Sequence, residues 1–246
     1  EGMVVSLKGR VVLPTLRPFV LLRRNITVPA RLPHWVEIGA LFLALVAGYV
    51  NAIGLLSFEH QSVSHLSGTA TLLGAGLLDR GWLSAVHLLG VLVSFLIGAA
   101  LAGALLNAST LKLGRHYDTA LTIEAALLIV AQLLLNEGLF YAHFLASAAC
   151  GLQNALATRY SGAVVRTTHL TGIVTDLGIM LGAKCRGEPI DGRKLQLFLV
   201  IIGGFIAGGT GGALAFSDYE QLALVLPAAV CLLMALAYHR FVRRQR

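Results

Sequence analysis

A duplicated motif organises this sequence. Residues 64–74 read SHLSGTATLLG, and residues 168–178 read THLTGIVTDLG. The two copies lie 104 residues apart. The identical positions are His65 with His169, Leu66 with Leu170, Gly68 with Gly172, Thr71 with Thr175, Leu73 with Leu177 and Gly74 with Gly178. Small residues are common in membrane helices, but this does not explain a His and a Thr that recur together.

The likeness extends to both sides of the motif. The upstream matches, at an offset of 103 residues, are Gly48 with Gly151, Asn51 with Asn154 and Ala52 with Ala155. Downstream, the glycine-rich run 95–105 resembles the run 205–214. The sequence therefore predicts two homologous membrane repeats, residues 36–137 and 138–240. They are flanked by a basic N-terminal extension, residues 1–35, and a basic tail, residues 241–246.

The composition is that of a polytopic membrane protein. Of the 246 residues, 57% are hydrophobic and only 13% are charged, against about 25% charged residues in soluble domains. This excludes a soluble enzyme, a disordered regulator and a disulfide scaffold. The net charge of +7 is concentrated near the two ends of the chain, which predicts contact with anionic lipids and not with nucleic acid. The three cysteines have no metal-site or redox spacing, and we expect no cofactor and no metal.

Eight apolar segments predict an all-α fold. Six are long enough to cross a bilayer, while the second and sixth are shorter and carry the two motif copies. The segments are residues 36–56, 62–78, 83–106, 118–136, 139–158, 167–183, 195–216 and 219–239.

Two topologies are compatible with these segments. If all eight cross, four basic residues lie outside: Lys112, Arg115, Arg159 and Arg166. If the two motif helices are re-entrant, six segments cross and only Arg80 lies outside. The positive-inside rule favours six crossings with both termini cytoplasmic. The halves are then inverted relative to each other, as in many secondary transporters.

The motifs SHLSG and THLTG, each after an Asn-bearing helix, resemble those of the YoaK-like bacterial membrane proteins, a family known as domain of unknown function 1275. The resemblance covers roughly residues 36–240. It implies a multi-pass protein of the bacterial inner membrane with six to seven spans. It implies no substrate and no catalytic residue.

Polar side chains near the starts of the motif helices form the predicted binding site. Ser64 and Thr168 stand where N-caps would, and the free N–H groups of a helix start attract polar or anionic groups. The residues expected to bind substrate are Asn51, Ser64, His65, Ser67, Thr71, Asn154, Thr168, His169, Thr171 and Thr175. The alternatives are that the hydroxyls bond to their own helix carbonyls and that the histidines bridge helices structurally.

Two carboxyl groups are candidates for proton coupling. Asp176 interrupts an apolar motif helix, where its counterpart is Leu72, and Glu124 lies in the fourth apolar segment. An acidic residue inside the membrane is costly and therefore indicates function or a structural ion pair. For Asp176 the pair could be formed with Arg166.

These features favour a small secondary transporter or channel for a small polar or anionic solute. One alternative is a non-transporting scaffold subunit. A second is an intramembrane metal-dependent enzyme with His65, His169 and Asp176 as ligands, although no hydrolase or nucleotide-binding motif occurs. The glycine-rich segment 195–216 could also support a homo-oligomer.

Overall fold

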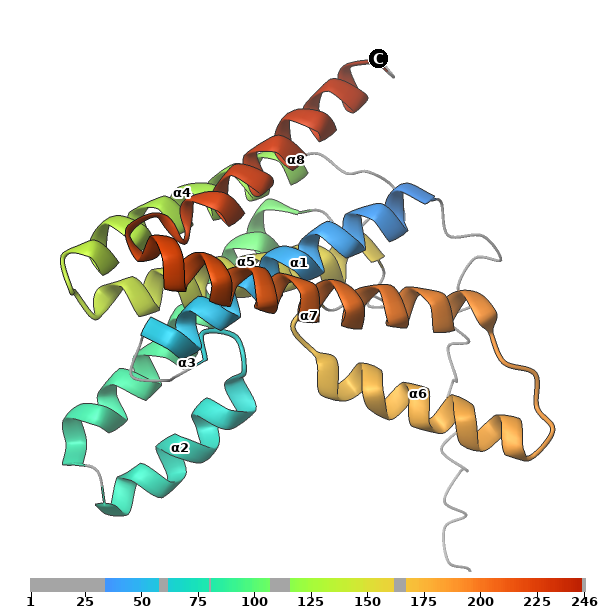
Figure 1. The fold of residues 1–246 in the computed structure, drawn as a ribbon, viewed down its shortest axis with the longest axis horizontal. Coiled ribbons are helices and arrows are strands. Elements are labelled where there is room, and N and C mark those ends of the chain that lie inside the picture. Colours follow the sequence, from blue (N-terminus) through green and yellow to red (C-terminus); the bar gives the residue numbers. More distant parts are fainter. Residues whose placement is uncertain (1–33, 58–61, 80, 107–115, 162–166, 245–246) are drawn as a thin grey trace, which may run out of the picture. The chain divides into compact units, whose positions relative to one another are not determined.

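The computed structural model describes residues 34–57, 62–79, 81–106, 116–161 and 167–244. The predicted extension 1–35 lies almost wholly outside the described residues, and so does the end of the predicted tail. The elements are α1 (His34–Ser57), α2 (Leu66–Asp79), α3 (Gly81–Leu105), α4 (Tyr117–Asn136), α5 (Tyr141–Ser161), α6 (Leu170–Cys185), α7 (Gly192–Tyr219), the short 3₁₀ helix η1 (Glu220–Leu222) and α8 (Val225–Arg244) (Figure 1).

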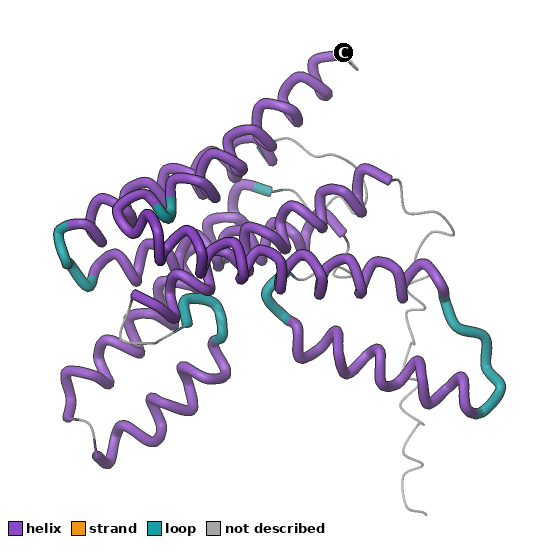
Figure 2. Tube along the Cα trace, viewed as in Figure 1, coloured by secondary structure: helices purple, strands orange, loops and turns teal. Residues whose placement is uncertain are grey.

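The described residues contain helices and no strand (Figure 2). Five helical segments among them are long and apolar enough to cross a membrane: α1, α3, α4, α7 together with η1, and α8. The prediction of an all-α polytopic membrane protein is confirmed. The motif helices α2 and α6 have 14 and 16 residues, which is too short for a bilayer core about 30 Å thick at 1.5 Å per residue.

Helix α5 has 21 residues but a more polar composition than the five apolar segments. Its buried polar side chains include His143, Ser147 and Gln153. The hydroxyl of Ser147 donates to the carbonyl of Val91 on α3, and the amide of Gln153 donates to that of Leu43 on α1. Since α5 packs against α1, α3 and α4, neighbouring helices and not lipid satisfy its polar groups, and it need not be apolar.

Glycines allow the backbones of two helix pairs to touch. A side chain at Gly48 of α1 would overlap the carbonyl oxygen of Phe205 on α7, and a side chain at Gly151 of α5 would overlap that of Phe95 on α3. Small residues permit such close approach in membrane helices. The pairs α1–α7 and α3–α5 therefore make the same kind of contact.

The same pairs touch at a second point. A side chain at Gly208 of α7 would overlap the carbonyl oxygen of Leu45, and one at Gly98 of α3 would overlap that of Ala148. Gly208 belongs to the glycine-rich segment that was expected to pack internally or between copies. This face of the segment packs against α1 within the chain, whereas Gly203 has open space around it. The homo-oligomer stays a prediction.

Helices α1 and α7 run in the same direction. Leu41 lies against Gly204, and two turns further along both helices Tyr49 lies against Gly212. The residue numbers rise together, which is the mark of a parallel pair.

Helices α3 and α5 are also parallel. Gly90 lies against the ring of Phe144, and further along both helices Gly103 lies closest to Arg159. These two parallel pairs are the most extensive helix contacts in the fold.

Helices α1 and α5 run in opposite directions. The Gln153 amide reaches the carbonyl oxygen of Leu43, near the start of α1, at 3.2 Å. At the other end of the pair, His143 lies close to the backbone of Ser62, which follows α1.

Helix α4 is antiparallel to both α5 and α8. Residues 137–140 close the α4–α5 hairpin (Figure 1). Tyr117 at the start of α4 packs on Tyr238 near the end of α8, with ring centroids 5.8 Å apart. Gln132 near the end of α4 accepts a hydrogen bond of 2.6 Å from the backbone N–H of Leu224, just before α8.

These directions favour one of the two topologies. Helices α1, α4 and α7 run one way, and α3, α5 and α8 run the other way. Helix α2 therefore joins two helices of opposite direction, α1 and α3, and α6 likewise joins α5 and α7. Eight crossings would require α1 and α3 to run the same way. The helix directions are those expected for six crossings with α2 and α6 as additional short helices, and five of the six longer helices in the described part of the chain are apolar enough to cross.

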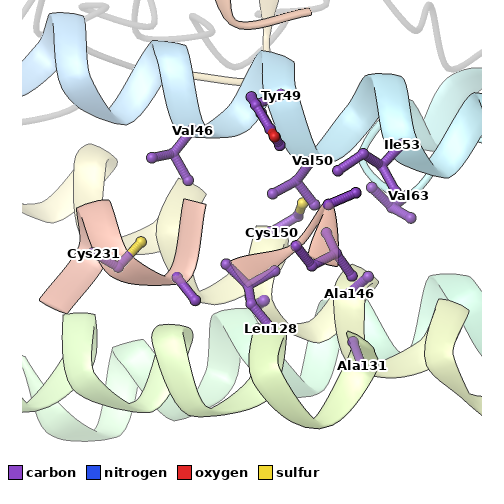
Figure 3. Close-up of a cluster of buried hydrophobic side chains, with 14 of the residues drawn as sticks. Val46, Tyr49, Val50, Ile53, Val63, Leu128, Ala131, Ala146, Cys150 and Cys231 are labelled. Carbon is purple, nitrogen blue, oxygen red and sulfur yellow. The ribbon is translucent and has the colours of Figure 1, made fainter. Parts of the chain in front are cut away.

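A cluster of buried apolar side chains lies where α1, α4, α5 and the start of α8 meet (Figure 3). Val46, Val50 and Ile53 of α1 face Leu128 of α4 and the alanines of α5. Alanine contributes little bulk, so helices approach closely and the polar groups nearby are shielded from lipid.

We predict that the glycine contacts between helix pairs are essential to stability. Gly48→Ala and Gly151→Ala should each lower the free energy of unfolding by about 1–3 kcal/mol, because the added methyl overpacks a backbone contact. Gly203→Ala is the matched control, since it gains the same helix propensity with open space around it. Thermal unfolding of the purified protein in detergent measures the three changes. Equal effects at all three positions would contradict the packing argument.

Candidate functional site

Both motif histidines lie across the first turn of their helices. The ring of His65 covers Gly68, and the ring of His169 covers Gly172, so that a side chain at either glycine would clash with the imidazole. This explains the motif spacing, because the residue three positions after the histidine must be small. Both histidines are exposed.

The start of α2 is held by a polar network. The hydroxyl oxygen of Ser62 accepts hydrogen bonds from the backbone N–H of Ser64, at 3.3 Å, and of His65, at 2.8 Å. The hydroxyls of Ser62 and Ser64 both donate to Oδ1 of Asn51, at 2.5 and 2.8 Å. Ser62, which the sequence analysis did not select, therefore holds the turn that precedes α2. Asn51 and Ser64 are brought together as expected and connect α2 to α1.

The corresponding place in the second half is different. The side-chain oxygens of Asn154 and Thr167 are buried and have no hydrogen-bond partner in the described part of the chain. Thr168, which follows Thr167 in the sequence, is half-buried. The counterpart of Ser62 is Arg166, which lies outside the described residues. The second half thus has unsatisfied polar atoms where the first half has a closed network.

The threonines of the motif helices bond to their own helices. The Thr71 hydroxyl donates to the carbonyl of Ser67 at 2.9 Å, and the Thr175 hydroxyl donates to that of Thr171 at 2.8 Å. All four residues are exposed. The back-bonding alternative thus describes Thr71 and Thr175, although their hydroxyl oxygens can still accept a hydrogen bond.

Asp176 forms an ion pair between α6 and α7. Its Oδ2 lies 3.5 Å from Nζ of Lys194, and the two side chains are 47% and 35% exposed. The Lys194 ammonium also lies 5.3 Å from the centre of the Phe198 ring. The partner that was expected for Asp176, Arg166, is outside the described residues. A pair this exposed contributes at most about 1 kcal/mol to stability.

Glu124 is in the opposite environment. It is 1% exposed on α4, and Oε2 has no hydrogen-bond partner among the described residues. The Cys231 thiol of α8 hydrogen-bonds to its carboxyl group, and the Cys150 thiol of α5 lies nearby. An ionised carboxylate isolated from water is very costly, so this environment stabilises the neutral, protonated form.

His87, which is half-buried, and His143, which is buried, form a pair that lies outside the two motif copies. Nε2 of His87 on α3 lies 3.0 Å from Nδ1 of His143 on α5. His143 is fully buried. The pair thus links α3 to α5. No local spacing signals it, since it requires α3 and α5 to be neighbours.

Within the described ranges, no group of three or more His, Cys, Asp or Glu side chains is arranged to hold a metal ion. His65, His169 and Asp176 therefore do not converge on a common metal site in this structure. The intramembrane metal enzyme gains no support from their geometry.

The comparisons with known proteins agree with the resemblance of the motifs. The family described as "Protein of unknown function (DUF1275)" matches residues 39–237. The "UPF0700 transmembrane protein YoaK" of Bacillus subtilis (strain 168) is 29% identical over 202 residues, which cover 75% of this chain and 86% of that protein. No solved structure matches. Because the family match covers most of the chain, the protein belongs to the DUF1275 family of YoaK-like membrane proteins.

Proposed function

We propose that the protein is a small secondary transporter or channel for a small polar or anionic solute. The observation that carries the proposal is the repetition of one glycine contact in two helix pairs. Gly48 against Phe205 corresponds to Gly151 against Phe95. Gly48 and Gly151 are 103 residues apart in the sequence, and Phe95 and Phe205 are 110 residues apart.

The second contact follows the same rule. The contact of Leu45 with Gly208 corresponds to the contact of Ala148 with Gly98. Leu45 and Ala148 are again 103 residues apart, and Gly98 and Gly208 are 110 residues apart. Helices α1 and α5 are equivalent by this rule, yet they run in opposite directions. This supports an internal duplication whose halves are inverted, the arrangement in which one half can exchange its conformation with the other.

The two halves differ in a way that supports two conformations. Asn51 has its oxygen satisfied by two serines, whereas Asn154 does not. Helix α2 packs along α3, but α6 makes few contacts with α7 and has one buried residue, Ile173. If the halves are equivalent, each could adopt the arrangement of the other, and a ligand that prefers one state would shift the balance.

The chemistry of the helix starts favours a polar or anionic solute. Both motif helices begin with an exposed imidazole beside free N–H groups. The expected binding residues include Asn51 and Ser64 near the start of α2, and Thr168 and His169 directly before α6. His65 and His169 are the side chains with which we expect the solute to interact directly.

The two carboxyl groups would have different parts in proton coupling. Glu124 has the buried environment that holds a proton, and it would release this proton only in a state that admits water or a cation. Asp176 is already half exposed and paired with Lys194. We propose that the Asp176–Lys194 pair changes as α6 moves, whereas Glu124 carries the proton.

The transport proposal is tested with purified protein in liposomes, on a solid-supported membrane that records currents. The probes are succinate, phosphate, glutamate and chloride. We expect protein-dependent currents for at least one probe. His65→Ala and His169→Ala should each reduce them roughly tenfold, the effect of losing one hydrogen bond to a charged group.

His239→Ala is the control, because His239 pairs with Asp118 and is not part of either motif. All variants must show the wild-type thermal unfolding. Absence of current for every probe with folded protein would contradict transport of an anionic solute.

We further predict that Glu124→Gln separates solute exchange from proton drive. Glutamine mimics the neutral carboxyl group, so the variant should fold and exchange solute without a gradient, but a pH gradient should no longer drive uptake. The matched control is Glu137→Gln, an exposed glutamate at the end of the same helix. Retention of full gradient-driven uptake by Glu124→Gln would show that Glu124 does not carry the proton.

Asp176→Asn and Lys194→Gln distinguish the role of the ion pair. Both remove the pair, but only the first removes the carboxyl group. Equal losses of uptake in the two variants would show that the pair acts as a link between α6 and α7.

A further inference from the structure

A groove of about 550 Å³ lies between α1, α4, α5 and α8, away from both motif copies. Apolar and aromatic side chains form almost all of its wall. They include Trp35 and Phe42 of α1, Tyr117 and Leu121 of α4, and Leu233 and Phe241 of α8. The groove contains almost no polar surface, so it is not suited to the polar solute proposed above.

The groove follows one face of α8. Its wall on this helix consists of Val230, Leu233, Met234, Ala237, Tyr238 and Phe241, the spacing of a single helical stripe. Leu233 is 65% exposed and Phe42 on the opposite wall is 42% exposed. The groove therefore opens sideways, where lipid surrounds a membrane helix.

One end of the groove is polar and mainly basic. The Asp118 carboxylate, at the start of α4, lies 2.8 Å from Nδ1 of His239. The Arg159 guanidinium lies near Tyr117, and Arg240 is exposed on α8 next to Phe241. The acidic groups at this end are Asp118, which has His239 as its partner, and Glu37 in the first turn of α1.

We propose that this groove binds an anionic phospholipid, with one acyl chain along the apolar wall and the phosphate near Arg240 and Arg159. The volume is within the range of about 300–1,000 Å³ found for small-molecule sites. Tyrosine and tryptophan near one end are typical of the depth at which lipid headgroups lie. Basic residues beside a pocket between membrane helices favour an anionic over a zwitterionic headgroup.

Thermal unfolding of the detergent-purified protein tests the proposal. Phosphatidylglycerol and phosphatidylcholine with identical acyl chains are the probes, and native mass spectrometry counts the bound lipids. Phosphatidylglycerol should raise the unfolding temperature in proportion to its concentration, because a ligand of the native state stabilises it. Phosphatidylcholine should bind about fivefold more weakly for each cation that contributes.

Two pairs of variants locate the site. Leu233→Trp fills the groove, whereas Leu236→Trp changes an exposed leucine of the same helix that does not line it. Arg240→Gln removes a headgroup cation, whereas Arg243→Gln removes an exposed cation one turn further along. We expect Leu233→Trp and Arg240→Gln to weaken binding of phosphatidylglycerol about fivefold or more, and the two controls to bind as wild type.

Three results would overturn the proposal. These are equal binding of the two lipids, equal effects of the groove variants and their controls, and no bound lipid in the wild type, as expected if another part of the chain fills the groove. If Leu233→Trp does not fold, the test rests on Arg240→Gln, because Arg240 is exposed and its substitution leaves the packing of α8 unchanged.

Discussion

The structure depends on backbone contact between helices at glycine. In hydrocarbon no hydrophobic force drives helices together, so close packing and internal hydrogen bonds must do so. Gly48 and Gly151 each place a helix backbone against the carbonyl of its neighbour. These contacts hold together the parallel pairs α1–α7 and α3–α5. The directions of these pairs make α2 and α6 short helices between helices of opposite direction.

A second constraint follows from the first. Non-helical backbone in a membrane protein must be satisfied by protein or by water in a cavity. At the start of α2 this is achieved by Asn51, Ser62 and Ser64. Between η1 and α8 it is achieved by Gln132, which accepts from Leu224 and donates to the carbonyl of Glu220. Asn154 and Glu124 are the contrasting cases. Each has a buried oxygen atom without a hydrogen-bond partner among the described residues, and these are the positions at which we propose movement or protonation.

The helices and the motif could be predicted from the sequence, because apolar length and repeated spacing are local properties. The helix directions also agree with the six-crossing prediction, which rests on how the distribution of lysine and arginine reflects the placement of loops across a membrane. The partners of individual side chains could not be predicted. Lys194 beside Asp176 and the pair His87–His143 depend on which helices are neighbours. Ser62, which holds the turn before α2, was overlooked because the duplicated motif begins at Ser64.

The central claim, that α6 does not cross and the two halves are inverted, is tested most directly by the accessibility of two single cysteines. Glu137→Cys and Glu188→Cys, each with the exposed Cys185 replaced by serine, lie on the two sides of the segment α5–α6. A membrane-impermeant maleimide is added to intact cells and then to permeabilised cells. The account predicts that the two positions lie on opposite faces, so that only one is labelled in intact cells. Labelling of both, or protection of both until permeabilisation, would place them on one face and contradict the inverted arrangement.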